Sequence, residues 1–166
     1  MVVSLRIGFP QTPRLSYQSE VSPAHGAPLH MSSPKTILLM DDDDDILEAM
    51  RVVFSLLGHR VVTAKDGMAG IAAAEREKPD AVVVDMLMPK KSGFLVVEKL
   101  KSDPATAPRV VMITANAGGR HRAYAEMLGV DEYLRKPFAM AELVACVERL
   151  LQHASAPQTP PPKAQV

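Results

Sequence analysis

Residues 36–45, TILLMDDDDD, place a short apolar run directly before five consecutive carboxylates, and residues 81–89, AVVVDMLMP, repeat the arrangement around a single aspartate. Short apolar runs bounded by charged residues are typical of strands that are buried on both faces of a parallel sheet. Ligands of such sheets bind outside the carboxyl ends of the strands. The two stretches therefore predict that Asp41, Asp42 and Asp85 lie at one functional edge of a sheet.

Three further short apolar runs follow the same pattern, and longer segments of helical period separate all the runs from one another. The predicted strands cover residues 36–40, 60–64, 81–84, 109–113 and 132–135, and the later helices cover residues 68–76, 93–100, 119–128 and 140–151. Alternation of strands and helices predicts a parallel sheet with helices on both faces. The fold class is therefore α/β.

Apolar residues recur at helical spacing between the first two strands and again near the end of the last helix. The expected inward stripes are Ile46, Met50, Val53 and Leu57 on the first helix and Leu143, Val147, Leu150 and Leu151 on the last. Gly58 follows the first stripe, at the position where a left-handed residue commonly ends a helix. We therefore expect the first helix to end at this glycine.

The prolines gather toward both ends of the chain. This composition predicts a disordered extension over residues 1–34 and a disordered proline-rich tail over residues 153–166, with one folded domain over residues 35–152. Met31 offers an alternative start, in which case residues 1–30 do not belong to the working protein.

The overall composition excludes several classes of protein. Lys and Arg together equal Asp and Glu at 19 each, so the broad basic surface of a nucleic-acid binder is missing and no direct nucleic-acid partner is expected. The single cysteine, Cys146, cannot form an internal disulfide, and the five histidines lack ligand spacing. No apolar run approaches the length of about 18 residues that spans a membrane. The sequence predicts a cytoplasmic protein without membrane contact.

The five aspartates after the first strand have two different explanations. Acidic residues stabilise the first turn of a helix, which accounts for residues 43–45. Asp41 and Asp42 precede the helix, and their repulsion of Asp85 calls for a cation. Mg²⁺ binds one or two carboxylates and keeps positions for water and phosphate oxygens. We therefore expect a magnesium site at this edge, with Mn²⁺ as the alternative ion.

The remaining strand ends carry a hydroxyl and an ammonium group. The motifs, in chain order, are Asp41-Asp42, Asp85 with Met88-Pro89 and Gly93, Thr114-Ala115, and Tyr133 three residues before Lys136-Pro137-Phe138. With these motifs, residues 35–152 resemble the receiver domains of two-component response regulators, of the single-domain, stand-alone type.

The resemblance implies a flavodoxin-like (βα)5 fold, a doubly wound parallel sheet with strand order 2-1-3-4-5. It also implies that Asp85 accepts a phosphoryl group from a histidine kinase or a histidine phosphotransfer protein. The other roles that it implies are metal binding by Asp41, Asp42, Asp85 and the backbone carbonyl of Leu87, contact with the phosphoryl oxygens by Thr114 and Lys136, and switching by Thr114 and Tyr133. The surface of the fourth helix, fifth strand and fifth helix is then expected to bind a downstream protein partner.

Two alternatives to a phosphorylated signalling domain remain. A magnesium-dependent aspartyl-phosphate phosphatase on a related fold would need a carboxylate two residues after Asp85, where Leu87 stands. A receiver-like protein that binds constitutively would not need the complete set of site residues. The leading interpretation is a signalling protein, not an enzyme acting on another substrate, that catalyses its own phosphorylation and dephosphorylation. Leu87 and Asn116 are expected to flank the water that hydrolyses the phosphate, and Leu87 cannot orient it.

Overall fold

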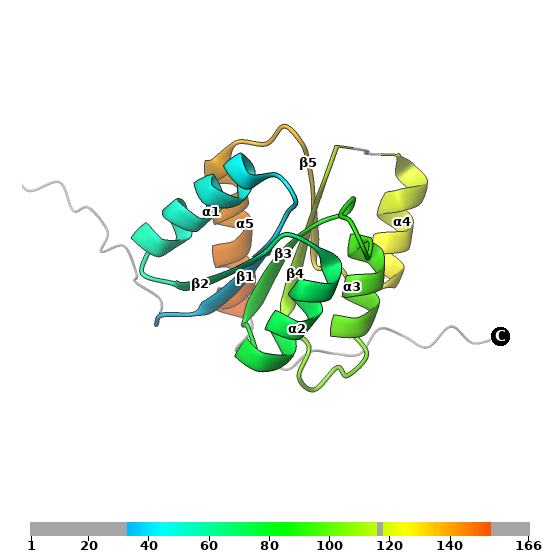
Figure 1. Cartoon of the computed structure of the whole chain (residues 1–166), viewed down its shortest axis with the longest axis horizontal. Coiled ribbons are helices and arrows are strands. Elements are labelled where there is room, and N and C mark those ends of the chain that lie inside the picture. The colour runs from blue at the N-terminus through cyan, green and yellow to red at the C-terminus, as the bar shows by residue number, and fades with distance from the viewer. Residues whose placement is uncertain (1–32, 116–117, 154–166) are drawn as a thin grey trace, which may run out of the picture. The chain divides into compact units, whose positions relative to one another are not determined.

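The computed structural model describes residues 33–115 and 118–153. The predicted N-terminal extension and proline-rich tail fall almost entirely outside these ranges, as does Asn116. Strands and helices alternate along the described chain (Figure 1), in the order β1 (Thr36–Met40), α1 (Asp44–Leu56), β2 (Arg60–Ala64), α2 (Gly67–Glu77), β3 (Ala81–Asp85), α3 (Gly93–Leu100), β4 (Arg109–Thr114), α4 (Gly119–Met127), β5 (Glu132–Arg135) and α5 (Met140–His153). None of these helices is long and apolar enough to cross a membrane.

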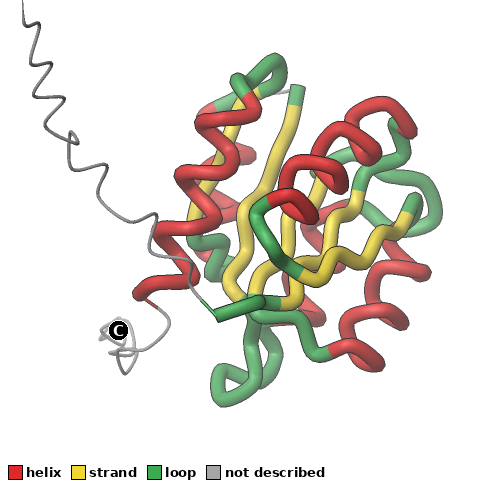
Figure 2. The backbone as a smooth tube through the Cα atoms, turned by 90° about the vertical axis from the view of Figure 1, so that its left-hand side faces the viewer, coloured by secondary structure: helices red, strands yellow, loops and turns green. Residues whose placement is uncertain are grey.

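The strands form one parallel sheet with the order β2-β1-β3-β4-β5. The predicted flavodoxin-like fold and its strand order are therefore confirmed. Helices cover both faces of the sheet (Figure 2), with α1 and α5 on one face and α2, α3 and α4 on the other. The strand order reverses between β1 and β3, so the carboxyl ends of these two strands flank the point where such sheets bind ligands.

Side chains of β1 alternate between the two faces of the sheet. Ile37 and Leu39 join the apolar cluster under α1 and α5, whereas Leu38 and Met40 join the cluster under α2, α3 and α4. All four are fully buried. Because helices cover both faces, the strand needs no polar alternation. Helix α2 packs against the Met40 side chain of β1 at Gly70, where an added Cβ would lie 1.7 Å from Met40 Cε.

Strands β3 and β4 each continue one residue beyond their predicted ends. The register pairs Asp85 with Ile113 and Thr114 with Arg135, so the ladder includes both polar residues. The predicted boundaries at residues 84 and 113 were therefore one residue short. Because Asp85 and Thr114 are the last residues of their strands, the sheet itself fixes the positions of their side chains.

The buried face of α1 matches the predicted stripe only in part: Met50 is buried and Ile46 packs partly buried against the same cluster. Leu47, Met50 and Phe54 are buried, and Leu57, which was expected to point inward, is 41% exposed at the end of the helix. Both sets of positions have helical spacing, but the observed face buries the large ring of Phe54 and so removes more apolar area from water. The predicted end of the helix is confirmed, since Gly58 has a φ of 87°.

The stripe predicted for α5 is largely confirmed. Leu143, Val147 and Leu151 are buried, and Leu150 packs against the same cluster while partly buried. Cys146 is buried beside them, as expected of a small core residue, and burial raises the pKa of its thiol to about 11.

The edge opposite the carboxyl ends is held by a charged cluster around Asp131. Its Oδ2 accepts hydrogen bonds from Lys101 Nζ at 2.7 Å and from the backbone N–H of Val110 at 2.8 Å, and its Oδ1 accepts one from Arg109 at 3.0 Å. The side chains of Asp131, Lys101 and Arg109 are each 14–16% exposed. One carboxylate thus joins the end of α3, the start of β4 and the segment before β5.

Candidate functional site

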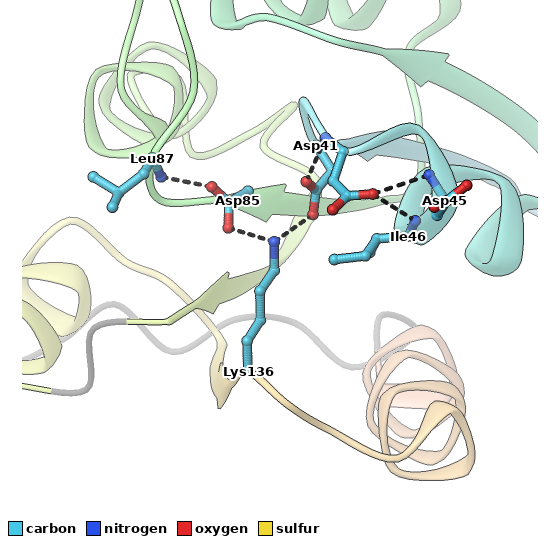
Figure 3. Close-up of polar contacts among 7 residues, drawn as sticks. Asp41, Asp45, Ile46, Asp85, Leu87 and Lys136 are labelled. Carbon is cyan, nitrogen blue, oxygen red and sulfur yellow. Dashed lines mark hydrogen bonds and ion pairs between the residues drawn. The ribbon is translucent and has the colours of Figure 1, made fainter.

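Two carboxylates at the carboxyl ends of β1 and β3 meet the ammonium group of a lysine that follows β5 (Figure 3). Asp41 directly follows β1, Asp85 ends β3, Thr114 ends β4, and Lys136 directly follows β5. Lys136 Nζ lies 2.7 Å from Asp41 Oδ2 and 2.9 Å from Asp85 Oδ1. The backbone N–H of Lys136 also donates to the carbonyl of Thr114 at 2.7 Å. The structure therefore brings these four predicted site residues together.

Asp85 is held at both carboxylate oxygens. Oδ1 meets Lys136, and Oδ2 accepts a hydrogen bond from the backbone N–H of Leu87 at 2.7 Å. Burial raises the pKa of Asp85, the hydrogen bond and charge of Lys136 lower it in part, and the charge of Asp41 raises it further. The Asp85 carboxylate is thus held in a fixed orientation, and burial makes its charged form less favourable. Perturbed pKa values of this kind are common at functional sites.

Lys136 is the counter-charge that two buried carboxylates share. Asp41 is fully buried and Asp85 is 5% exposed. Burial lowers the pKa of Lys136, but its hydrogen bonds with Asp41 and Asp85 outweigh that effect, and the pKa is raised overall. The ammonium group therefore stays charged at neutral pH, and it leaves one negative charge uncompensated before the exposed Asp42 is counted.

The aspartates after β1 divide into site residues and helix-capping residues. Asp41 Oδ1 accepts a hydrogen bond from the backbone N–H of Asp43 at 3.0 Å, which orients its carboxylate. Asp43 is the N-cap of α1 and accepts from the backbone N–H groups of Asp45 and Ile46. The prediction that residues 43–45 start the helix is confirmed.

The predicted switch residues contact each other directly. Thr114 is fully buried, and its hydroxyl lies 3.6 Å from Met86 Sδ. A side-chain hydrogen bond also links Thr114 to the hydroxyl of the half-buried Tyr133; burial raises the pKa of that phenol, and this bond lowers it in part. This bond could not be predicted from local sequence patterns, because it joins two different strands.

The loop between β3 and α3 carries Leu87 and depends on a glycine. The side chain of Leu87 is 61% exposed, while its backbone N–H contacts Asp85. Gly93 N–H donates to the carbonyl of Met86 at 2.9 Å, and a Cβ at position 93 would lie 2.3 Å from the carbonyl oxygen of Asp85. Glycine is therefore required at position 93 for α3 to begin this close to Asp85.

The donor set at this edge fits a hard divalent cation. Within residues 33–115 and 118–153, no three His, Cys, Asp or Glu side chains converge as a ready-made metal cluster. Mg²⁺ does not need one, since it binds one or two carboxylates and completes its shell with water. Asp41, Asp42 and Asp85 offer only oxygen donors, and together with Lys136 they leave an excess of negative charge for a cation to neutralise.

Comparisons with known proteins identify the family that the chain matches. The family model of the response regulator receiver domain matches residues 37–148. The chain is 36% identical to the probable transcriptional regulatory protein TcrX of Mycobacterium tuberculosis over 72% of this chain and 50% of the relative, and 35% identical to response regulator MprA of Mycobacterium sp. (strain KMS) over 76% of this chain and 55% of the relative. It thus spans about half the length of the curated relatives that it matches.

Solved structures show the same likeness. A CheY-like receiver domain from Methanospirillum hungatei JF-1 superimposes with a TM-score of 0.68 at 26% identity, covering 73% of this chain and 96% of the other. The receiver domain of sensor histidine kinase PA1611 from Pseudomonas aeruginosa PAO1, solved with a magnesium ion coordinated in the active site cleft, gives a TM-score of 0.65 at 27% identity, covering 72% of this chain and 99% of the other.

Proposed function

The chain belongs to the family of response regulator receiver domains of two-component systems, and on that premise we propose that Asp85 accepts a phosphoryl group from a histidine kinase or a histidine phosphotransfer protein. The observation that carries the proposal is the Asp85 carboxylate, which is fixed between the Lys136 ammonium group at 2.9 Å and the Leu87 N–H at 2.7 Å. Phosphoryl transfer needs little from a protein beyond such positioning and charge neutralisation.

In the proposed reaction, a carboxylate oxygen of Asp85 bonds to phosphorus while the phosphorus–nitrogen bond of the donor histidine breaks. The imidazole leaves with the electron pair of that bond and takes a proton from water. Lys136 is already within hydrogen-bonding distance of the nucleophile, so its charge stabilises the phosphoryl oxygens as they arrive. The Thr114 hydroxyl, at the end of the neighbouring strand, is the second donor to these oxygens.

Magnesium is the proposed cofactor, with manganese as the alternative. Asp41, Asp42, Asp85 and the Leu87 carbonyl would hold it. When bound, the ion neutralises the charge that accumulates on the phosphoryl oxygens and the carboxylates. The magnesium in the PA1611 receiver domain supports the assignment by analogy.

Phosphorylation is proposed to act on a partner surface through Thr114 and Tyr133. The Thr114 hydroxyl now bonds to Tyr133. If that hydroxyl turns toward the phosphate, Tyr133 loses its partner and the surface formed by α4, β5 and α5 changes. We propose that this surface binds a downstream protein and that the domain, over residues 35–152, acts in the cytoplasm without contacting nucleic acid itself.

The test is phosphorylation of the purified protein with magnesium and a small-molecule phosphodonor, followed by intact mass spectrometry. The wild type should gain one phosphoryl group, and Asp85→Asn should gain none. Asp45→Asn is the matched control, since it removes a carboxylate from the first turn of α1 on the same edge. Phosphorylation of Asp85→Asn, or failure of the wild type to react after removal of any phosphate already bound, would overturn the proposal.

A further inference from the structure

The loop over residues 86–92 is anchored at both ends by backbone hydrogen bonds. Met86 N–H donates to the carbonyl of Ile113 in β4 at 2.9 Å, and the Met86 carbonyl accepts from Gly93 N–H at 2.9 Å. Between these anchors lies Leu87, which donates to Asp85 and carries the carbonyl proposed for the metal. The shape of the middle of the loop therefore decides where two groups of the site lie.

Helix α2 holds the middle of this loop from outside the site. Lys90 Nζ lies 2.6 Å from Asp66 Oδ2, and Asp66 Oδ1 accepts a hydrogen bond from the backbone N–H of Ala69 at 2.8 Å. One carboxylate thus caps α2 and binds the loop. The Asp66 side chain is only 14% exposed. The hydrogen bond from Lys90, followed by that from Ala69, lowers the pKa of Asp66, so the carboxylate is charged at neutral pH.

The backbone of the loop also requires this support. Lys90 has a φ of 66°, a left-handed conformation that residues with a Cβ seldom adopt. The preceding carbonyl, that of Pro89, accepts from Lys91 N–H at 2.8 Å and from Gly67 N–H at 3.5 Å. Such conformations persist where neighbouring structure holds them in place.

Gly67, the first residue of α2, touches the loop backbone. A Cβ at position 67 would lie 2.5 Å from the carbonyl oxygen of Lys91 and 2.6 Å from its Cβ. Real Cβ atoms do not come this close, so any side chain would push the loop or the helix away. Gly70, one turn later, meets only the side chain of Met40.

From these contacts we infer that the N-terminus of α2, through Asp66 and Gly67, positions the loop after Asp85 for phosphoryl acceptance, and that Asp66, Gly67 and Lys90 are positioning residues for that reaction. The inference rests on the proposed function. Neither Asp66 nor Gly67 contacts the phosphoryl group; both act through Leu87. A misplacement of about 1 Å at a reacting centre can slow a reaction by about a hundred-fold.

The first test compares two lysines with the same exposure. Lys90 and Lys65 are each 64% exposed and form ion pairs of 2.6 Å, but Lys65 pairs with Asp44 on α1, away from the loop. Lys90→Gln should slow phosphorylation by a small-molecule donor about two- to five-fold, the rate equivalent of one partly exposed ion pair. Lys65→Gln should react like the wild type, and Lys90→Arg should restore the rate because it restores the charge.

The second test compares two glycines of α2. Gly67→Ala should slow phosphorylation by about ten-fold or more, since the clash is with loop backbone. Gly70→Ala should lower the melting temperature at least as much, because its Cβ meets the core side chain of Met40, yet phosphorylate at the wild-type rate. If both glycines had only a structural role, the phosphorylation rate of each variant would instead fall in step with its melting temperature.

The third measurement needs no phosphorylation. The amide ¹H–¹⁵N resonance of Leu87 should shift in Lys90→Gln and Gly67→Ala and stay in place in Lys65→Gln. If the wild type is phosphorylated but Lys90→Gln and Gly67→Ala react like their controls, the positioning role is wrong while the proposed function stands. If the wild type is never phosphorylated, the proposed function is wrong, and an unshifted Leu87 amide would also overturn the claim that α2 positions this loop.

Discussion

Replacing Lys136 by alanine should destabilise the metal-free protein strongly, because it removes the charge that two buried carboxylates share. Asp41 is fully buried, and the side chain of Asp85 is 7% exposed. In the variant the two carboxylates face each other with no cation. Removing one partner of a buried ion pair costs about 3–5 kcal/mol. Lys136 is 18% exposed, so water can enter its place, and we expect a somewhat smaller loss than in a fully buried pair, of about 2–4 kcal/mol.

The loss should also depend on pH in a defined direction. The folded-state pKa of Asp85 is already raised, chiefly by burial, and Lys136 is the group that lowers it most. Without Lys136 that pKa rises further. An acid with a raised folded-state pKa destabilises the folded protein while it is ionised, so the variant regains stability as the pH falls through that pKa toward the unfolded value. The difference between variant and wild type should therefore be largest at neutral pH and shrink in mild acid.

Urea unfolding followed by circular dichroism, in the presence of a chelator, measures this difference. With a slope of about 1–3 kcal/mol per molar urea, the midpoint should fall by about 1–2 M. Lys65→Ala, which breaks an exposed ion pair, is the control and should change stability by less than about 1 kcal/mol. Added Mg²⁺ should stabilise Lys136→Ala more than the wild type, since a divalent cation replaces the missing charge. A loss below about 0.5 kcal/mol, or one that does not depend on pH, would refute the shared counter-charge.

Three further perturbations test other parts of the structure. Asp131→Ala should cost about 3–5 kcal/mol in urea unfolding, because it removes the carboxylate that two partly buried cations and a buried N–H share. Glu48→Ala, which breaks an exposed ion pair, should cost less than about 1 kcal/mol, and similar losses in the two variants would contradict this ranking. Leu87→Asn should speed loss of the aspartyl-phosphate several-fold, the effect of about 1 kcal/mol, because an amide can orient the attacking water; unchanged decay after removal of the donor would exclude position 87 from that step. Cys146 should resist iodoacetamide at pH 8 in the folded protein, because it is buried and its pKa is about 11, and should react fully in urea; rapid labelling of the native state would show that α5 opens.

The site was largely predictable from the sequence because each of its residues belongs to a strand end. A parallel sheet brings all carboxyl ends to one edge, so recognising the strands before Asp41, Asp85, Thr114 and Lys136 was sufficient to place these residues together. Their contacts were not predictable. That Lys136 bridges two carboxylates, or that Thr114 bonds to Tyr133, depends on side-chain conformations that no local pattern specifies.

The support of the site was missed for the same reason. Asp66 and Lys90 are 24 residues apart and belong to different elements, so nothing in either local pattern marks them as a pair. Asp66-Gly67 could have been recognised as a helix start, but not as a contact of the loop after Asp85. The predicted stripe of α1 was only partly correct for a different reason. Two overlapping sets of apolar residues had helical spacing, and only packing against the sheet could select between them.

The charges at the two edges of the sheet are balanced differently, and this difference indicates toward which strands a change at Asp85 would be transmitted. At the opposite edge, the Asp131 carboxylate accepts hydrogen bonds from two cations and a backbone N–H, so its charge is already compensated. At the carboxyl edge, two buried carboxylates share one ammonium group, and the buried Asp85 is held with a raised pKa. If Asp85 accepts a phosphoryl group, as proposed, further negative charge is added where compensation is already short, and the nearest donors would be drawn inward. Lys136 and Thr114 are those donors, and both adjoin β5. On that proposal, we expect the structural change to pass toward β5 and its flanking helices, and not toward the opposite edge.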